Sequence, residues 1–409
     1  MNCRFCKEEL KNVFIDLVNS PASNSFLTKE ELNEPETFYP LKVYTCANCF
    51  LVQVDEYKKS DAIFDSNYAY FSSYSKSWLA HAKQYTDMMT ERFGYNQDSL
   101  IIEVASNDGY LLQYFKEKNI PVMGIEPTAN TAEVAIGKGI KTVIEFFSAE
   151  LADRFANDWD VKADLLLGNN VLAHVPDIMD FVAGIKIILK DTGVVTMEFP
   201  HLMQLIDNSQ FDTIYHEHFS YLSFYTVQQI FASQGLELFD VEEIPTHGGS
   251  LRIYAKHAAD SSKPVSENVA ALLKKEIDKG MATLDYYHNF QQKVLKVKLN
   301  LTDFLIQQKR AGKKVAAYGA AAKGNTLLNY CGIKNDLIDF VVDANPHKQD
   351  KFLPASHIPV VNEQYLKDAK PDFVIILPWN LKDEITFQLN YIKEWGGQFV
   401  IPIPELQIL

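Results

Sequence analysis

Two pairs of cysteines near the start of the chain constrain its fold more than any other feature. The first pair lies in Cys3-Arg4-Phe5-Cys6 and the second in Cys46-Ala47-Asn48-Cys49. Each short turn aims two thiolates at one point, so the doubled C-x-x-C pattern predicts one tetrahedral zinc site. A redox pair, another metal and a disulfide framework are the alternatives, and nothing else in the chain is typical of a secreted protein. A site with four cysteine ligands is closed, so this zinc should hold structure and not do chemistry.

The size and charge of the chain narrow its class. A length of 409 residues exceeds one ordinary hydrophobic core and predicts roughly two to three domains. The net charge of −14 argues against nucleic acid or an anionic membrane as the main partner. No apolar leader follows Met1, and no apolar run approaches the length of a membrane span, so we expect a cytoplasmic protein.

Short apolar segments alternate with helical patterns along most of the chain, which predicts parallel sheets with helices on their faces. The expected strands of the first α/β unit are residues 100–104, 122–126, 164–168 and 194–198, and those of a second unit are 315–318, 337–342, 373–377 and 398–401. Residues 219–234 are expected to form a helix, and residues 266–279 and 284–310 long connecting helices. The predicted organisation is a zinc module with a lid stretch over 1–75, an α/β domain over 76–260, connecting helices over 261–310 and a second α/β domain over 311–409.

The segment Ile-Ile-Glu-Val-Ala-Ser-Asn-Asp-Gly at residues 101–109 predicts a strand, a tight turn and a helix start. Gly109 provides the permissive backbone, and backbone amides at such a turn favour polar or anionic groups. Glu126 ends the next expected strand, where an acid can bind ribose hydroxyls. A full G-x-G-x-x-G is absent, which disfavours the pyrophosphate of NAD, whereas S-adenosylmethionine has no phosphate. The alternative is a strand-turn-helix with a fortuitous acid.

Two further segments place polar side chains together. Asn169, Asn170 and His174 follow an apolar strand, and ligands bind at the carboxyl ends of such strands. The block Tyr215-His216-Glu217-His218 favours acid–base chemistry, because histidine titrates near neutral pH and its neighbours can tune it. A metal held by the two histidines, or a polar helix start with satisfied histidines, are the alternative interpretations.

Four motifs occur together: the doubled C-x-x-C, Glu-Val-Ala-Ser-Asn-Asp-Gly, Gly-Asn-Asn-Val-Leu-Ala-His-Val and Tyr-His-Glu-His-Phe-Ser-Tyr. They resemble the zinc-containing, S-adenosylmethionine-dependent C-methyltransferases of nucleotide-activated deoxysugars, which typically methylate dTDP-4-keto sugars at C3. Residues 319–326, Gly-Ala-Ala-Ala-Lys-Gly-Asn-Thr, resemble the C-terminal domain of the same family, so the likeness covers essentially the whole chain. It implies a Rossmann-like methyltransferase domain in the centre and a second Rossmann-like α/β domain that helps to bind the nucleotide-sugar.

The resemblance also implies roles for single residues. A base removes the proton next to the ketone, and donors stabilise the developing oxyanion. His218 is then the expected base, Tyr215 and Glu217 orient it or polarise the sugar, and Tyr70 is a further catalytic contact. The expected cofactor-binding residues are Glu103, Ser106, Asn107, Gly109, Glu126, Pro127, Asn169 and Asn170. The expected substrate contacts are His174, His247, Arg252, Lys323 and Asn325, and the zinc ligands are Cys3, Cys6, Cys46 and Cys49.

Several of these residues have structural alternatives. His174 can be a satisfied histidine at a strand end, Tyr70 a packing residue, and Arg252 a surface residue beside a tight hairpin. The turn with Lys323 lacks a full Walker pattern, and its domain can be a scaffold only.

The resulting prediction is a sugar C-methyltransferase with S-adenosylmethionine and structural zinc, acting on a dTDP- or GDP-linked 4-keto sugar as a monomer or homodimer. A sugar O-methyltransferase, an NAD-linked oxidoreductase and a non-catalytic zinc-ribbon scaffold are the competing hypotheses.

Overall fold

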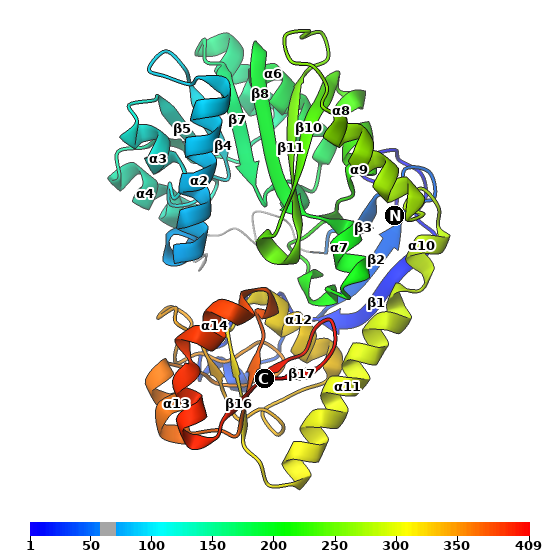
Figure 1. Ribbon diagram of the computed structural model, residues 1–409, viewed down its shortest axis with the longest axis vertical. Coiled ribbons are helices and arrows are strands. Elements are labelled where there is room, and N and C mark those ends of the chain that lie inside the picture. Colours follow the sequence, from blue (N-terminus) through cyan, green and yellow to red (C-terminus); the bar gives the residue numbers. More distant parts are fainter. Residues whose placement is uncertain (58–70) are drawn as a thin grey trace.

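The computed structural model describes residues 1–57 and 71–409. Within these residues three sheets form, and Figure 1 shows a central unit, a C-terminal unit below it and an N-terminal sheet beside both. The predicted catalytic contact Tyr70 lies outside the described residues, so its role stays a prediction. In the same residues, no helix is both long and apolar enough to cross a bilayer.

The N-terminal sheet joins segments that are far apart in sequence. Its strands run antiparallel in the order β1 (Asn12–Ser20), β2 (Tyr39–Thr45), β3 (Val52–Val54) and β9 (Ser220–Tyr221). Val52 pairs with Tyr221 and Gln53 with Ser220. The register between β3 and β9 therefore fixes the chain directly after His218 to the N-terminal module.

The central sheet has the order β10-β11-β8-β7-β4-β5-β6. Its parallel strands are β4 (Ile101–Val104), β5 (Val122–Ile125), β6 (Lys141–Val143), β7 (Ala163–Asn169) and β8 (Leu189–Pro200), followed by the antiparallel β10 (Leu236–Ile244) and β11 (Ser250–His257). Its helices are α2 (Lys76–Phe93), α3 (Leu112–Glu117), α4 (Ala129–Gly137), α5 (Ala149–Asp153), α6 (Ile178–Ile188), α7 (Leu202–Asp207) and α8 (Phe224–Ser233). Every residue of β4 is buried, as expected for a parallel strand covered on both faces.

Local sequence explains where the helices begin. The Ser75 side chain accepts from the backbone N–H of Trp78 at the start of α2, and Ser223 accepts from Thr226 at the start of α8. The prediction of one helix over 219–234 was wrong at its start, because residues 220–221 pair with β3 and Ser223 is the cap. β10 was not anticipated.

The C-terminal sheet has the order β14-β13-β12-β15-β16-β17, parallel except for its last strand. Its strands are β12 (Val315–Tyr318), β13 (Val341–Val342), β14 (Val360–Val361), β15 (Phe373–Ile376), β16 (Gln398–Ile401) and β17 (Gln407–Ile408), with helices α12 (Ala322–Cys331), α13 (Glu363–Ala369) and α14 (Lys382–Gln388). The expected strand over 337–342 is confirmed only in its last two residues.

Helices connect the two α/β units, as the sequence predicts. They are α9 (Glu267–Asp278), α10 (Asp285–His288) and α11 (Phe290–Arg310). Figure 1 shows α11 running from the central unit down the side of the C-terminal unit. Apolar side chains of β1, α11 and the C-terminal sheet, such as Phe14, Val294 and Ile375, belong to one continuous core. The C-terminal unit is therefore packed against the N-terminal sheet and is not a separately tethered domain.

Candidate active site

The candidate site lies at the carboxyl ends of the central parallel strands, on the side that faces the C-terminal unit (Figure 1). β4, β7 and β8 are neighbours, so the loops that follow them meet at one edge. His174 ends the short 3-10 helix Leu172–His174 after β7, and His218 lies in the loop before β9. Their ring centroids are 4.5 Å apart in an edge-to-face arrangement. The fold thus brings together two histidines from separate sequence motifs.

The hydrogen bonds of His218 define its protonation state. Nδ1 lies 2.9 Å from the carbonyl oxygen of Thr213, which can only accept, so Nδ1 carries the hydrogen. Nε2 lies 2.8 Å from the Tyr215 hydroxyl, which donates to it. Burial lowers the pKa of His218 well below its ordinary value, and nearby His174 lowers it further. His218 is therefore neutral near pH 7, with its basic lone pair on Nε2. Burial similarly lowers the pKa of His174 to about 4, against a hydrogen bond to the Glu217 backbone.

The two residues between Tyr215 and His218 point to the N-terminal module. The side-chain amide of Asn24 donates to a carboxylate oxygen of Glu217 over 2.7 Å. His216 Nε2 lies 3.2 Å from the carbonyl oxygen of Pro40, and its ring meets that of Tyr39 edge-on at 5.7 Å. His216 therefore belongs to the packing of this loop.

The turn after β4 has the left-handed backbone that a close approach to a ligand requires. Asn107 has φ +49° and Gly109 has φ +74°, and a Cβ on Gly109 would lie 2.5 Å from Ile140 Cδ1. Buried Glu126 accepts from the backbone N–H groups of Asn107 and Thr128 at 2.8 and 2.9 Å, and burial raises the pKa of its carboxyl group. Glu126 thus pins the turn to the end of β5, and its carboxylate keeps acceptor sites for a ribose.

Other residues predicted to bind the cofactor lie around this turn. Glu103 is buried in β4, where burial raises the pKa of its carboxyl group well above the ordinary value despite a hydrogen bond with Tyr110. Ser106 faces β5, since a Cβ on Gly124 would come 2.4 Å from its hydroxyl oxygen. Pro127 follows β5 and is partly buried. The structure gives Ser106 a packing contact rather than an open position.

Two side-chain amides at the carboxyl end of β7 have polar atoms that a bound ligand could pair with. Both side-chain polar atoms of Asn169 and the side-chain oxygen of Asn170 are buried without a hydrogen-bond partner among residues 1–57 and 71–409. Asn170 has φ +58°, and its backbone N–H donates to the Glu198 carbonyl over 2.8 Å. Buried amides normally have partners, so a polar cofactor or ordered water belongs here. These amides, the acid of β5 and the left-handed turn fit S-adenosylmethionine.

Lys323 reaches the site from the C-terminal unit. Its Nζ donates to Asn380 Oδ1 over 2.8 Å and lies 5.1 Å from the centre of the Trp379 ring. Trp379 Nε1 in turn donates to a carboxylate oxygen of Asp212 over 2.7 Å. Burial raises the pKa of Asp212 to about 6, and burial lowers the pKa of Lys323. The charge of Lys323 also lowers the pKa of His218, so this cation lies within electrostatic reach of the predicted base.

α12 also holds the loop that carries the predicted base. The Thr326 hydroxyl donates to the Ile214 carbonyl over 2.9 Å, directly before Tyr215. Buried Asn325 donates its side-chain amide to the Ser23 carbonyl over 2.6 Å. The amide nitrogen of this predicted substrate contact therefore faces the N-terminal module.

His247 lies within electrostatic reach of Lys323, whereas Arg252 is bound within the central sheet. His247 has φ +56° and meets the Trp78 ring edge-on at 5.2 Å. Burial, followed by the charge of Lys323, lowers the pKa of His247 to about 4. Arg252 is only 5% exposed and donates to Glu198 over 2.8 Å.

Arg252 belongs to a buried ion-pair network. It also donates to Glu242 over 2.7 Å, and its guanidinium lies 5.1 Å from the Tyr85 ring centre. His81 Nε2 contacts the other carboxylate oxygen of Glu198 at 2.8 Å. Carboxylates of the central sheet thus neutralise the guanidinium. Arg252 is therefore neither the exposed hairpin residue nor the free phosphate-binding residue that the sequence suggested.

Four cysteines form the cysteine cluster, consisting of Cys3, Cys6, Cys46 and Cys49. Their sulfur atoms all lie within 4.8 Å of one another, and the thiols are not joined in disulfides. Both pairs sit in the same kind of turn: Lys7 and Phe50 have φ +63° and +60°, and their N–H groups donate back to the first cysteine of each pair at 3.1 Å. This donor set fits a tetrahedral Zn²⁺.

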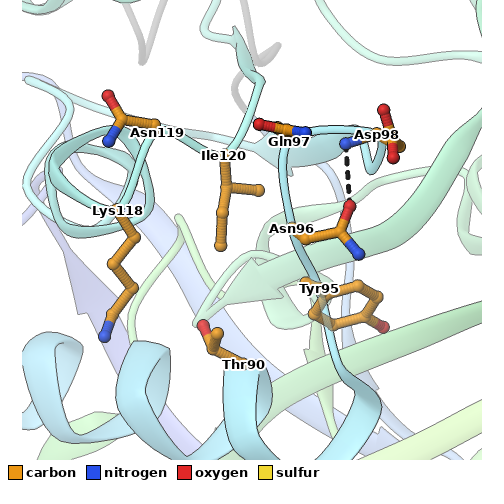
Figure 2. A pocket seen from close by; sticks show the side chains of 8 residues that line it. All are labelled: Thr90, Tyr95, Asn96, Gln97, Asp98, Lys118, Asn119 and Ile120. Carbon is orange, nitrogen blue, oxygen red and sulfur yellow. Dashed lines mark hydrogen bonds between the residues drawn. The ribbon is translucent and has the colours of Figure 1, made fainter.

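A surface hollow lies at the opposite end of the central sheet. Figure 2 shows its lining from the end of α2, the following loop and the end of α3, with Asn96 accepting from the Asp98 backbone. It precedes β4, whereas ligands of such sheets bind after the strands. The hollow is therefore not part of the candidate active site.

Sequence reasoning missed residues that complete the site. Asn24 contacts Glu217, and Trp379 contacts Asp212. Of these three missed residues, only Trp379 has a position in the sequence that could have indicated a site, because it follows the carboxyl end of β15. No sequence signal marks Arg4, which lies between the cysteines of the first pair and contacts both histidine loops.

Family models match the chain in three consecutive segments. A model described as "Putative zinc binding domain" matches residues 3–64, a "Methyltransferase domain" model matches 78–241, and a "C-methyltransferase C-terminal domain" model matches 245–404. Among solved structures, a SAM-dependent methyltransferase from Anabaena variabilis is 15% identical with a TM-score of 0.36, covering 44% of this chain and 86% of that one. A magnesium protoporphyrin IX methyltransferase from Synechocystis, solved with SAM, is 13% identical with a TM-score of 0.33, covering 44% and 80%.

A curated relative covers the chain from end to end. C-methyltransferase NovU from Streptomyces niveus is 33% identical over 407 residues, which is 100% of this chain and 96% of that protein. The match runs through the cysteine cluster, the cofactor turn and the histidine loops in one alignment. The chain therefore belongs to the C-methyltransferase family that carries an N-terminal zinc-binding domain, and it is a SAM-dependent C-methyltransferase.

Proposed function

We propose that this enzyme methylates C3, the carbon next to the keto group, of a nucleotide-activated 4-keto-deoxysugar, as a step in branched deoxysugar biosynthesis. The observation that carries the proposal is the state of His218. The Thr213 carbonyl holds the Nδ1 hydrogen, so the basic lone pair lies on Nε2. A carbon nucleophile made by proton removal needs such a base, and the family assignment requires a methyl transfer to carbon.

The cofactor is proposed to lie across the ends of β4, β5 and β7. Glu126 would hold its ribose hydroxyls, the turn around Asn107 and Gly109 would admit its backbone contacts, and Asn169 and Asn170 would bind its polar groups. When bound, S-adenosylmethionine supplies an electrophilic methyl group on a sulfonium.

His218 Nε2 is proposed to take the C3 proton, and the electrons of that C–H bond move toward the keto group to form an enolate. The Tyr215 hydroxyl, which donates to Nε2 here, turns to the keto oxygen when the sugar binds, which frees the Nε2 lone pair for the C3 proton and leaves the hydroxyl donating to the enolate oxygen. The Thr213 carbonyl keeps accepting from Nδ1 and so supports the imidazolium. His174 lies against His218, Glu217 orients the loop of the base through its contact with Asn24, and Tyr70 is a proposed additional donor.

Lys323 and His247 are proposed to face the diphosphate of the nucleotide-sugar. A half-buried ammonium within electrostatic reach of the base is the kind of group that pairs with an anionic substrate in a protein of net negative charge. Asn325 is proposed to contribute its side-chain oxygen, which has no partner among the described residues. Arg252 is proposed to orient Glu198 and His81 instead of binding phosphate.

The cysteine cluster is proposed to hold one structural Zn²⁺. We also propose domain boundaries near residues 75, 260 and 310. The units so divided are packed together, because β9 joins the N-terminal sheet and one apolar core extends into the C-terminal unit.

The direct test is to incubate the enzyme with S-adenosylmethionine and a panel of dTDP- and GDP-linked 4-keto sugars, followed by mass spectrometry and NMR of the product. We expect a new C–CH₃ group at C3. Methylation at C5, the other carbon beside the ketone, would correct the position, and a methyl ether would show an O-methyltransferase.

A second measurement isolates proton removal. In D₂O without cofactor, we expect exchange of the C3 hydrogen for deuterium with the sugar that is methylated. No exchange with a methylated sugar would contradict a base that acts before methyl transfer.

A further inference from the structure

Arg4, between the cysteines of the first pair, reaches both histidine loops of the active site. Its Nε donates to the Pro176 carbonyl and its Nη1 to the Phe219 carbonyl, each over 3.1 Å. Phe219 directly follows His218, and Pro176 lies two residues after His174. One partly buried side chain therefore spans the backbone next to both histidines.

The shape of the guanidinium makes this contact a geometric constraint. Its N–H groups lie in one rigid plane, so two carbonyls that it binds are fixed relative to one another. The ammonium of a lysine has three rotatable donors, so it could bind a carbonyl without fixing the angle between the two. The carbonyls fixed by Arg4 belong to the loops whose histidine rings lie 4.5 Å apart.

Arg4 is itself fixed on the cysteine cluster. Its backbone N–H donates to Gln53 Oε1 over 2.9 Å, and the other end of that fully buried amide donates to Cys3 Sγ over 3.2 Å. The guanidinium carbon also lies 5.3 Å from the centre of the Phe219 ring. Movement of the cysteine turn is therefore transmitted to the loop of His218.

We propose that Arg4 is a positioning residue that couples the cysteine cluster to the His174–His218 pair. The inference rests on the proposed role of His218 and adds a reason for a closed metal module in this enzyme. The module does no chemistry; through Arg4 it sets the separation and angle between the two histidine loops.

The test compares Arg4→Gln and Arg4→Lys with Lys11→Gln, a control that removes an exposed charge from the same module. We expect Arg4→Gln to lower kcat by about 10²-fold, the scale of a misplaced catalytic group, with KM for the methylated sugar within about threefold of wild type. The kcat of Arg4→Lys should lie between that of Arg4→Gln and that of wild type. Zinc content by elemental analysis should equal that of wild type in all three variants.

Amide hydrogen exchange of the protein without substrate supplies an independent measurement. Peptides covering residues 171–178 and 213–221 should exchange faster in Arg4→Gln, while the Lys11→Gln protein should match wild type. Wild-type inactivity on every sugar of the panel would reject the proposed substrate and leave this exchange test of Arg4 intact. Equal exchange and equal kcat in Arg4→Gln and Lys11→Gln would overturn the coupling, as would a raised KM at unchanged kcat.

Discussion

A single carbonyl decides which nitrogen of His218 can act as a base. Because Thr213 occupies Nδ1–H, the basic lone pair lies on Nε2, beside Tyr215. The sequence places two histidines within three residues, and only the resemblance to a known family, not the residue types, favoured His218 over His216 as the base. The path of the loop separates them: His216 contacts the Pro40 carbonyl, and the ring of His218 meets that of His174 edge to face.

The first residue-scale prediction separates these histidines. His218→Ala should lower methyl transfer by about 10²- to 10⁴-fold, the usual contribution of a general base, because no other group takes the proton. Affinity for S-adenosylmethionine, measured by calorimetry, should stay within about twofold. His216→Gln, which keeps a nitrogen where Nε2 meets the Pro40 carbonyl, serves as the control and should keep most of the activity. Equal losses in both variants would remove the assignment of the base.

The second residue-scale prediction concerns the pH dependence of stability. Burial lowers the pKa of His247 to about 4, below the value of about 6.5 in the unfolded chain, so the folded protein binds fewer protons between these values. This contribution to stability is present above pH 6.5 and is lost as the pH falls toward 4.

His247→Asn should therefore flatten the pH dependence of the unfolding free energy in this window, by up to about 1.4 kcal/mol per pH unit. Asparagine tolerates the left-handed backbone at this position. Denaturant titrations from pH 4 to 7 measure the slope, with exposed His288→Asn as the control. A slope equal to that of wild type would show that His247 is not held neutral.

At the scale of elements, the loop with His218 is held from two sides. β9 pairs with β3 on one side, and α12 bonds the Ile214 carbonyl on the other. The sequence predicted one helix over 219–234, which extends α8 back through the residues that form β9. Apolar periodicity predicts which face of a segment is buried. It does not tell whether a short apolar run such as residues 219–222 belongs to the helix or pairs as a strand with a distant segment.

The prediction at this scale concerns the 3-10 helix Trp379–Leu381, which joins the two α/β units through Asp212. Trp379→Phe removes the N–H that Asp212 accepts and leaves a fully buried carboxyl group without that donor. We expect a loss of roughly 1–3 kcal/mol in unfolding free energy. Trp395→Phe removes an N–H bonded to a neutral carbonyl in the same unit and should cost less. A double-mutant cycle with Asp212→Ala, which removes the acceptor, measures the coupling, and additive losses would refute it.

At the scale of the whole molecule, the N-terminal module packs directly against the candidate active site. Its sheet contains β9, its core is continuous with α11 and the C-terminal unit, and Asn24 contacts Glu217. Metal removal should therefore affect the active site as well as the module.

Cys6→Ser should lower zinc content below one per chain, lower the thermal midpoint and speed hydrogen exchange of β9 together, because the metal closes the module that β3 belongs to. Cys331→Ala provides the control, since this buried cysteine lies in α12, away from the cysteine cluster. Elemental analysis, calorimetry and exchange measure the three effects. A zinc-free Cys6→Ser protein with wild-type exchange at β9 would contradict the coupling.

The sequence alone determined the doubled C-x-x-C spacing, most strands of the two α/β units, the placement of Glu126 and Asn169 at strand ends, and the motif that contains His218. These features follow from local spacing and apolar periodicity, which neighbouring residues encode. Only the tertiary structure decided that His174 meets His218, that Lys323 arrives from the C-terminal unit, and that Arg252 is buried between carboxylates. It also revealed that Arg4 spans both histidine loops. Such contacts join residues far apart in the chain, and their geometry is set by how whole sheets pack rather than by any local pattern.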